Sequence, residues 1–465
     1  MNIRQSLSIV SVLLFLGGSL WGQNGGIDNQ MLEQIKKNST IVGESKAIQT
    51  AVSGNDINKL ALNRSNPVYN DTYFSNKVVS KGVCNQKSSG RCWLFTGLNV
   101  LRAKVIAKYN LGEFQFSQNY CFFYDQLEKS NLFLQAVIDT RNKPFDDKTV
   151  EWLFKNPIGD GGQFTGVVNL INKYGLVPAE IMPETYSSNN TSRMSQLIAL
   201  KLREYGLQLR DMAAKGEKLP ALTKQKTEML STIYRMLELN LGTPPTEFSY
   251  TQKDASGKPV STKTYTPQSF FKDFVGVDMS NYVMIMNDPT RPYNKVYEIE
   301  YDRHVYDGEN WKYLNLPMED IKKMAIASIK DSTMMYFSCD VGKFLNSENG
   351  FLDIDNYDYS SLMGTTFNMD KKQRIQTYAS GSSHAMTLCA VDLDENGTPK
   401  KWMVENSWGP SYGFKGHLIM TDKWFDEYMF RLVVDKKYIP NNIQSLLNQK
   451  SIVLPPWDPM FAEEE

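Results

Sequence analysis

Helix-like and strand-like patterns occupy different parts of this chain, and their order constrains the fold more than any other feature. Directly after Cys92, apolar residues recur at spacings of four, three and four, at Leu94, Leu98, Leu101 and Val105. This stripe is typical of a helix that turns one face to a core. Later segments alternate or run apolar for four to seven residues, as strands do, at 282–286, 334–337, 385–391 and 401–404. Helices first and strands second predict an α+β protein with a cleft between a helical and a β-rich half.

A block rich in Leu, Lys, Arg, Glu and Met separates these two parts. It runs from about Ser192 to Leu241 and is followed by Gly242 and the Pro244-Pro245 pair. Its pattern predicts two or three amphipathic helices, which the glycine and the prolines end. We interpret the block as an insertion into the fold and not as part of its core.

The first 22 residues are typical of a secretory signal peptide. Arg4 supplies the positive charge, residues 9–16 form a short apolar core, and a segment with small residues follows up to Gly22. The alternative is a membrane anchor, but the apolar run is much shorter than the ~20 residues that span a bilayer. We expect cleavage after Gly22 and a soluble, exported protein, periplasmic or secreted, with no membrane span left.

Charge and cysteine content exclude several classes of function. Lys plus Arg equals Asp plus Glu, at 51 each, so the whole chain gives no electrostatic case for a nucleic-acid or anionic-membrane partner. The five cysteines are an odd number at wide spacings, which is not a disulfide framework. The chain has no CxxC pair and only three histidines, so the sequence predicts no metal site. At least one thiol stays free unless it pairs between chains, which directs attention to a catalytic thiol.

Cys92 stands at the start of the predicted helix, in the segment NQKSSGRCW at 85–93. A helix N-terminus favours negative charge, so it stabilises the thiolate, which is the reactive form of cysteine. Gln86 lies six positions earlier, where its amide N–H₂ and the Cys92 N–H can together donate to an oxyanion. Gly90 lets the backbone approach the substrate closely. The alternative for Cys92 considered alone is a buried core thiol.

Two adjacent strands bring a histidine and an asparagine to one rim of the predicted sheet. His384 opens the first strand, and Asn406 closes the second after a turn at Asn396-Gly397. The Asn406 side chain can accept from the far ring N–H of His384, which fixes the tautomer, while the near nitrogen faces Cys92. Trp408 would cover that hydrogen bond from water and strengthen it. The predicted catalytic set is Cys92, His384, Asn406 and Gln86, supported by Trp93, Trp408 and Gly90.

This set of motifs resembles the papain family of cysteine peptidases. Ser89 stands where that family usually has a first cysteine, and Cys92 and His384 are 292 residues apart. The long separation and the string QKSSGRCWLF at 86–95 resemble the bleomycin hydrolase and aminopeptidase C branch. Further segments similar to that branch are FSQ at 116–118, GDGGQ at 159–163, KYGLVP at 173–178, LGTPP at 241–245, CDVGK at 339–343, SHAM at 383–386 and WDPM at 457–460. The resemblance covers the chain from about residue 80 to Met460.

The resemblance implies a papain-like two-lobed fold with a helical insertion and a C-terminal arm. Together with the sequence patterns above, it divides the chain into a signal peptide (1–22), an N-terminal extension (23–80), a helical lobe with the catalytic cysteine (81–191), the helical insertion (192–245), a β-rich lobe with the catalytic histidine and asparagine (246–450) and the arm (451–465). It also implies a homohexamer whose active sites face an interior channel. In that branch the arm lies in the cleft, and its terminal carboxylate holds the free α-amine of the substrate, so that residues are removed from N-termini.

Two features depart from that branch. The chain ends in Phe-Ala-Glu-Glu-Glu at 461–465 instead of the small apolar end that is usual there. It also carries a predicted signal peptide, although such relatives are typically cytosolic.

We therefore predict a thiol-dependent peptidase that cleaves peptides through a cysteinyl thioester, needs no cofactor and acts as an aminopeptidase. One alternative is an exported papain-like endopeptidase with the same triad and an open cleft. Another is a non-enzymatic binding or scaffold protein, for nucleic acid or a protein partner, in which the site is vestigial.

Overall fold

The computed structural model describes residues 25–39, 43–67, 71–79 and 81–461. The predicted signal peptide at 1–22 and the last four residues of the chain lie outside these ranges. The chain divides into two compact units, Met1–Ala61 and Leu62–Glu465. None of the described helices is long and apolar enough to cross a membrane.

The described residues of the smaller unit form the helices α1 (Asn29–Asn38), α2 (Glu44–Gly54) and α3 (Ile57–Ala61). Asp28 caps α1, because its carboxylate accepts the Met31 N–H at 2.8 Å and so satisfies one of the N–H groups that the first turn leaves unpaired.

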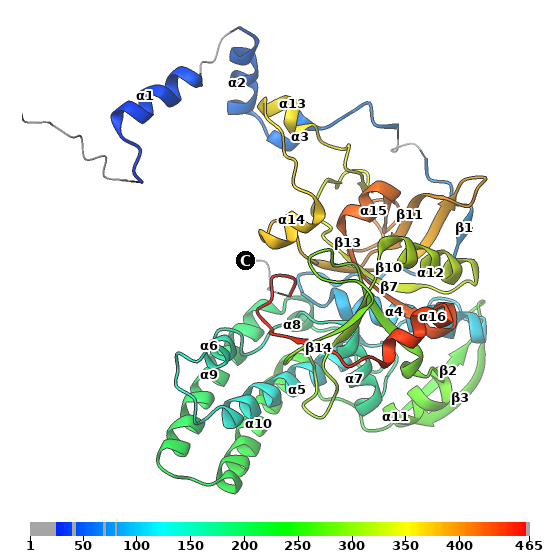
Figure 1. Ribbon diagram of the computed structural model, residues 1–465. Helices are drawn as coiled ribbons and strands as arrows, with labels where there is room; N and C mark the ends of the chain where they lie inside the picture. The colour runs from blue at the N-terminus through cyan, green and yellow to red at the C-terminus, as the bar shows by residue number, and fades with distance from the viewer. Residues whose placement is uncertain (1–24, 40–42, 68–70, 80, 462–465) are drawn as a thin grey trace, which may run out of the picture. The chain divides into compact units, whose positions relative to one another are not determined.

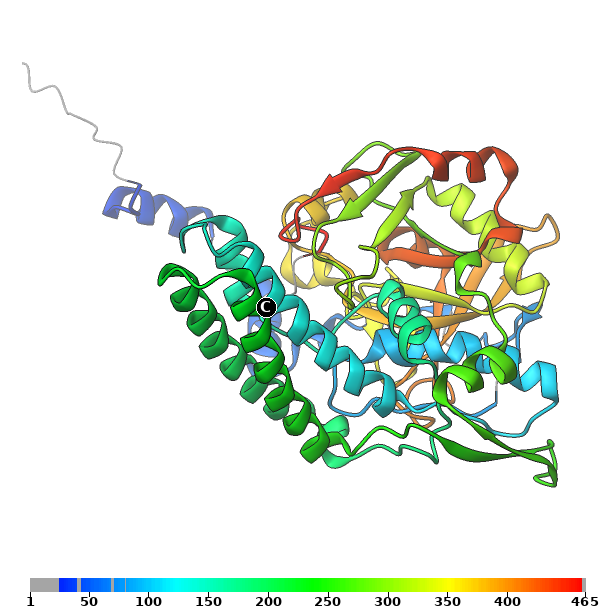
Figure 2. The same ribbon diagram turned by 90° about the horizontal axis from the view of Figure 1, so that it is seen from below.

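Helices dominate the first part of the larger unit (Figure 1). They are α4 (Cys92–Tyr109), α5 (Gln118–Asp139), α6 (Lys148–Lys155), α7 (Phe164–Tyr174), α8 (Tyr186–Asn189), α9 (Ser192–Ala214) and α10 (Leu219–Leu241). The block predicted as two or three amphipathic helices forms two, α9 and α10, which lie side by side and pack against α5 (Figure 2). Gly242 ends α10 with a φ of +88°, a conformation that glycine adopts without steric cost.

Strands dominate the second part and join in one sheet with the order β14-β5-β6-β4-β13-β7-β10-β11-β12-β9-β8, in which β1 pairs with β10. Their bounds are β1 (Asn76–Lys77), β4 (Tyr282–Met286), β5 (Lys295–Ile299), β6 (Lys312–Asn315), β7 (Met335–Cys339), β8 (Leu345–Asn346), β9 (Phe351–Leu352), β10 (His384–Leu393), β11 (Pro399–Glu405), β12 (His417–Thr421), β13 (Met429–Asp435) and β14 (Ile452–Leu454). The four strand segments expected from the sequence coincide or overlap with β4, β7, β10 and β11.

The remaining elements are short. A separate hairpin consists of β2 (Phe248–Lys253) and β3 (Pro259–Tyr265). The helices that connect the strands are α11 (Pro267–Ser269), α12 (Met318–Lys330), α13 (Tyr359–Met363), α14 (Lys371–Gln376), α15 (Asp422–Tyr428) and α16 (Asn441–Gln444).

Helix α4 is packed between the helices and the sheet. It contacts α5 and α7 on one side and β7 and β10 on the other. The single apolar stripe expected from the sequence is therefore too narrow, since Trp93, Phe95 and even the polar Asn99 and Arg102 are buried. Strand β10 is buried at every position except its last, Leu393. The element that begins with Cys92 is thus held on several sides by the core.

The C-terminal arm follows one edge of the sheet and then covers a group of aromatic rings. Strand β14 pairs in parallel with β5, and Asp458 forms an ion pair with Arg291 at 2.6 Å. Beyond it, the Phe461 ring meets the Trp311 ring edge-on, with centroids 5.0 Å apart. The fold therefore determines the position of the arm up to Phe461.

Candidate active site

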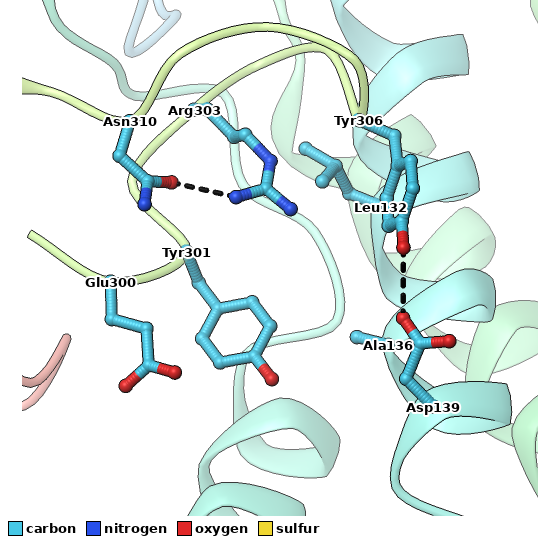
Figure 3. A pocket seen from close by; sticks show the side chains of 8 residues that line it. All are labelled: Leu132, Ala136, Asp139, Glu300, Tyr301, Arg303, Tyr306 and Asn310. Atoms are coloured by element: carbon cyan, nitrogen blue, oxygen red, sulfur yellow. Dashed lines mark hydrogen bonds between the residues drawn. The ribbon is translucent and has the colours of Figure 1, made fainter.

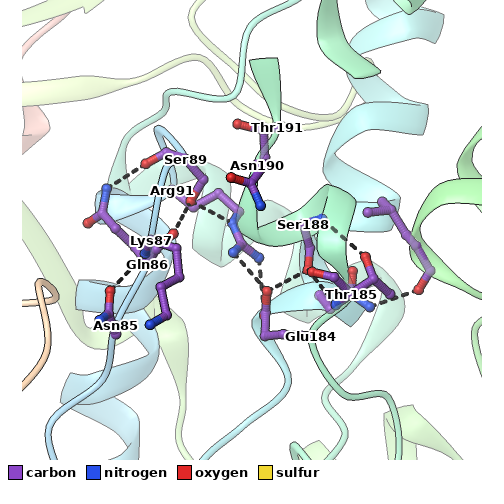
Figure 4. A network of polar contacts seen from close by, with 12 residues as sticks. Asn85, Gln86, Lys87, Ser89, Arg91, Glu184, Thr185, Ser188, Asn190 and Thr191 are labelled. Atoms are coloured by element: carbon purple, nitrogen blue, oxygen red, sulfur yellow. Dashed lines mark hydrogen bonds and ion pairs between the residues drawn. The ribbon is translucent and has the colours of Figure 1, made fainter. Parts of the chain in front are cut away.

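Cys92 is the first residue of α4, as the sequence predicts. Arg91 directly before it is fully buried and binds both carboxylate oxygens of Glu184, at 2.8 and 3.1 Å (Figure 4). The backbone N–H of Ala385, the residue after His384, acts on the Cys92 sulfur and lowers the pKa of its thiol. The thiol therefore lies at a helix N-terminus and against the start of β10.

His384 and Asn406 meet at one rim of the sheet. Strands β10 and β11 run antiparallel after the turn at Gly397, so the first residue of β10 lies beside the residue that follows β11. His384 Nε2 and Asn406 Oδ1 are 2.8 Å apart, and Asn406 Oδ1 also accepts the Ser407 N–H at 2.8 Å. Trp408 stacks on the imidazole, with ring centroids 4.7 Å apart and an interplanar angle of 27°. This arrangement fixes the ring and shields its bond to Asn406.

Gln86 is held on both sides of its amide. Its Nε2 donates to the Ser89 carbonyl at 2.6 Å (Figure 4), and its Oε1 accepts from the Ser407 hydroxyl at 2.6 Å. The Gln86 backbone N–H also donates to the Ser407 carbonyl at 2.7 Å. The loop before Cys92 is thus tied to the segment that carries Asn406, and one of the two Gln86 amide hydrogens stays available for another acceptor.

Gly90 also makes a close contact inside the protein, whereas its expected approach to the substrate stays a prediction. A β-carbon at this position would lie only 2.2 Å from Asp160 Oδ1. Asp160 accepts the Gly90 N–H at 2.7 Å and the Thr191 hydroxyl through the same oxygen, and its backbone carbonyl accepts the indole N–H of Trp93 at 2.9 Å. The absent side chain at Gly90 therefore admits a carboxylate that fixes the backbone before the nucleophile.

Burial determines the proton affinities of the two reactive groups. It raises the pKa of the Cys92 thiol, as does the Asp160 carboxylate, whereas two backbone N–H groups and the charge of Arg431 lower that pKa. Burial also lowers the pKa of His384 to about 4, against the opposing effect of its bond to Asn406. Each group taken alone thus favours its neutral form, and charge arises on both when a proton passes from sulfur to ring.

Arg431 on β13 was missed by the sequence reasoning. Only 8% of it is exposed, and it donates to Gln163 Oε1 at 2.7 Å and to the Met460 carbonyl at 3.4 Å. Its guanidinium lies over the Trp311 ring, 4.5 Å from the centroid. Arg431 thus binds the arm, and its charge acts on the Cys92 thiol. The one signal for it in the sequence was a cation between apolar residues of a strand.

The described part of the chain holds no group of three or more His, Cys, Asp or Glu side chains suited to a metal ion. All five cysteines are free thiols, and Cys92 is the one that is not fully buried. The arrangement thus offers a partly accessible nucleophile, a neighbouring base and an orienting amide, which is the set that acyl transfer requires.

Comparisons with known proteins agree with this geometry. The chain matches the model of the peptidase C1-like family over residues 26–461. Aminopeptidase C of Lactobacillus delbrueckii subsp. lactis is 38% identical over 417 residues, which are 89% of this chain and 93% of that protein. Bleomycin hydrolase of Homo sapiens is 38% identical over 429 residues, 90% of this chain and 94% of that protein. The crystal structure of PepW from Lactobacillus rhamnosis superposes with a TM-score of 0.91 at 38% identity, covering 94% of this chain and 99% of that one.

Proposed function

The chain belongs to the peptidase C1-like family and is a cysteine peptidase, and on this premise we propose that it is a thiol aminopeptidase whose active site is centred on Cys92. The observation that carries the proposal is a thiol at the first residue of α4 together with a His384 ring whose Nε2 lies 2.8 Å from Asn406 Oδ1. Relatives named aminopeptidase C, aminopeptidase G and bleomycin hydrolase favour this activity over that of an exported endopeptidase.

The hydrogen bonds around Asn406 define the tautomer of the base. Its Oδ1 accepts the Ser407 N–H, so the amide presents an acceptor to the ring and His384 Nε2 carries the hydrogen. The lone pair of the neutral ring then lies on Nδ1. In the proposed reaction Nδ1 takes the thiol proton as the sulfur of Cys92 attacks the peptide carbonyl.

Two later steps complete the turnover. The negative charge on the tetrahedral oxygen is stabilised by the Cys92 N–H and by the free amide hydrogen of Gln86. His384 then gives its proton to the leaving amine and, in the second half, activates the water that hydrolyses the thioester. Gly90, Trp93 and Trp408 support these steps by position, without contact with the reacting atoms.

The arm supports cleavage at the N-terminus of a peptide. Its Met460 carbonyl accepts a hydrogen bond from Arg431, whose charge acts on the Cys92 thiol, and residues 462–465 follow in the sequence. We expect these last residues to block the cleft beyond the first substrate residue and to hold its free α-amine with a carboxylate. Only peptides with an accessible N-terminus would then be cleaved.

A pair of fluorogenic peptides, one free and one acetylated at its N-terminus, tests the proposal in the presence of thiol. We expect turnover of the free peptide alone, and none with Cys92→Ala. Deletion of residues 462–465 should admit the acetylated peptide as well. Equal cleavage of both peptides by the intact chain would indicate an endopeptidase, and cleavage of neither would favour a binding protein.

Export, assembly and lobe boundaries are further proposals that rest on the sequence and on the resemblance. Export through the segment 1–22 predicts a mature N-terminus at Gln23, which N-terminal sequencing of the fractionated protein tests. A homohexamer predicts six times the chain mass of 53.1 kDa in sedimentation equilibrium. The proposed boundaries between the lobes lie near residues 191, 245 and 450. We expect limited proteolysis to cleave the chain close to these positions.

A further inference from the structure

Lys129 on α5 binds the segment 159–161, which is neither helix nor strand. Its Nζ donates to the Gly159 carbonyl at 3.1 Å and to the Gly161 carbonyl at 2.5 Å, and it pairs with the Asp125 carboxylate at 3.0 Å. An ammonium group has three N–H donors, so these three acceptors use all of them. Only 14% of the Lys129 side chain is exposed. The ammonium group is thus held at one position and is not a solvated surface charge.

The middle residue of this segment, Asp160, binds the backbone and the side chain that flank the nucleophile. Its carbonyl accepts the indole N–H of Trp93 at 2.9 Å, and its carboxylate accepts the Gly90 N–H at 2.7 Å. Gly90 stands two residues before Cys92, and Trp93 follows it directly. Three successive carbonyls are therefore bound, the outer two by Lys129 and the middle one by Trp93. The segment that Lys129 holds thus determines where Asp160 meets the surroundings of Cys92.

A fully buried carboxylate holds the ammonium group of Lys129. Asp125 pairs with Lys129, accepts from Gln126 Nε2 at 3.0 Å and lies 2.5 Å from His304 Nδ1. Burial raises the pKa of Asp125, but the neighbouring Lys129 and His304 lower it below its ordinary value. Gln126 Nε2 also donates to the Gly159 carbonyl at 2.9 Å. An ionised carboxylate with these partners keeps the cation in place inside the protein.

The loop between β5 and β6 brings His304 to this network. The His304 ring packs against Trp93, with centroids 4.6 Å apart. Gly162 lies against both rings, since a β-carbon there would be 2.3 Å from His304 Cε1 and 2.8 Å from Trp93 Cε2. Tyr306 of the same loop donates to Asp139, the last residue of α5, at 3.1 Å, beside a pocket of about 220 Å³ (Figure 3). The loop is thus attached to α5 at two places and packs against the residues around Trp93.

We propose that Lys129 is a positioning residue for the nucleophile. It acts through the segment 159–161, which places Asp160 and thereby the Gly90 N–H and the Trp93 ring on either side of Cys92. The inference rests on the proposed function, in which Cys92 attacks the peptide and its N–H stabilises the oxyanion. Loss of the two carbonyl bonds lets the segment move, and a displacement of about 1 Å beside the reacting atoms lowers the rate on the order of 10²-fold.

The first test compares Lys129→Met with Lys173→Met on a free-amine substrate, the aminomethylcoumarin of alanine. Lys173 also pairs with a buried carboxylate of α5, that of Glu128, at 2.8 Å, so its variant removes the same charge beside the same helix. We expect kcat to fall by about 10- to 100-fold in Lys129→Met with little change in KM, and to stay within about twofold in Lys173→Met. An unchanged kcat in Lys129→Met, or an equal loss in both variants, overturns the proposal.

A double variant separates the position of the segment from the stability of the fold. Lys129→Met leaves the buried Asp125 carboxylate without its cation and should lower the Tm. Adding Asp125→Asn removes that charge but restores no donor to the Gly159 and Gly161 carbonyls. We expect the Tm to recover in the double variant while kcat stays low. Recovery of kcat together with the Tm would mean that Lys129 acts through stability alone and overturns the proposal.

Alkylation of the thiol separates this inference from the proposed function. Cys92 is the one described cysteine that is not fully buried, so its reaction with iodoacetamide, corrected with Cys92→Ala, reports the thiolate without any peptide. Burial raises the pKa of the Cys92 thiol, whereas the backbone N–H groups of Ala385 and Trp93 lower it. In the double variant, which keeps the net charge, we expect the pH profile of alkylation to move up by about one unit, as for one lost hydrogen bond to the thiolate. This shift supports the role of Lys129 even if no peptide is turned over, and an unchanged profile overturns it even if the aminopeptidase assay succeeds.

Discussion

Gly90→Ala tests whether the carboxylate of Asp160 fixes the backbone before the nucleophile. The new β-carbon would lie 2.2 Å from Oδ1, whereas ordinary contact begins at 3.4 Å, so the carboxylate has to retreat by about 1.2 Å. Its 2.7 Å bond to the Gly90 N–H then exceeds hydrogen-bond range. Because a hydrogen bond to a charged group contributes about 1.5–3 kcal/mol, we expect a loss of about 2–3 kcal/mol in the free energy of unfolding.

Stability and rate report this change separately. A loss of that size lowers the Tm by about 2–4 °C in a chain of this length, which calorimetry resolves. A displacement of about 1 Å beside Cys92 lowers kcat/KM on the order of 10²-fold. Gly161→Ala is the matched control, since its β-carbon would meet nothing within 4 Å. In an Asp160→Ala background the Gly90→Ala change should lower the free energy of unfolding only slightly. An equal loss of stability in both backgrounds would refute the reasoning.

Three further predictions concern the residues around the thiol. Asn406→Ala removes the bond that orients His384 and should lower kcat by about 10- to 100-fold with little change in KM, measured by steady-state kinetics. His384 takes up a proton near pH 6.5 when unfolded but only near pH 4 when folded, so stability should fall by about 3 kcal/mol as the pH drops through this interval, and His384→Gln should lack this part of the slope in urea titrations. Arg102→Met removes the guanidinium that pairs with the buried Glu405 carboxylate, next to Asn406 in the sequence. It should lower the free energy of unfolding by about 3–5 kcal/mol in the same urea titrations.

Each of these predictions has an outcome that contradicts it. A change in KM alone for Asn406→Ala would mean that the amide serves binding and not the orientation of the ring. Parallel pH profiles for the histidine variant and the unsubstituted chain would assign the slope to other groups. An Arg102→Met protein as stable as the original would show that the buried pair is replaceable by an apolar side chain.

Local patterns were sufficient to predict where the candidate reactive groups lie in the fold. The helical spacing after Cys92 places the thiol at the N-terminus of α4, and the Asn396-Gly397 turn brings the ends of β10 and β11 to one rim. Both inferences use neighbours along the chain or across one hairpin. The catalytic roles of Gln86, His384 and Asn406 stay predictions, because they await the kinetic tests.

Contacts between distant segments were beyond sequence reasoning. The Gly90 backbone meets a carboxylate 70 residues away, and Arg431 reaches Gln163, the residue before α7, and the arm through tertiary packing. The breadth of burial on α4 was also underestimated, since its polar face meets a second layer.

The docking of the arm has a consequence for how this enzyme can change its selectivity over time. Strand β14, the Arg291–Asp458 pair and the Phe461 ring hold the arm in place before residue 462 is reached. Extension, trimming or replacement of the residues after Phe461 therefore leaves the contacts that hold the arm intact. Under the proposed role of the terminus, selection could change substrate selectivity there one residue at a time without disturbing these contacts.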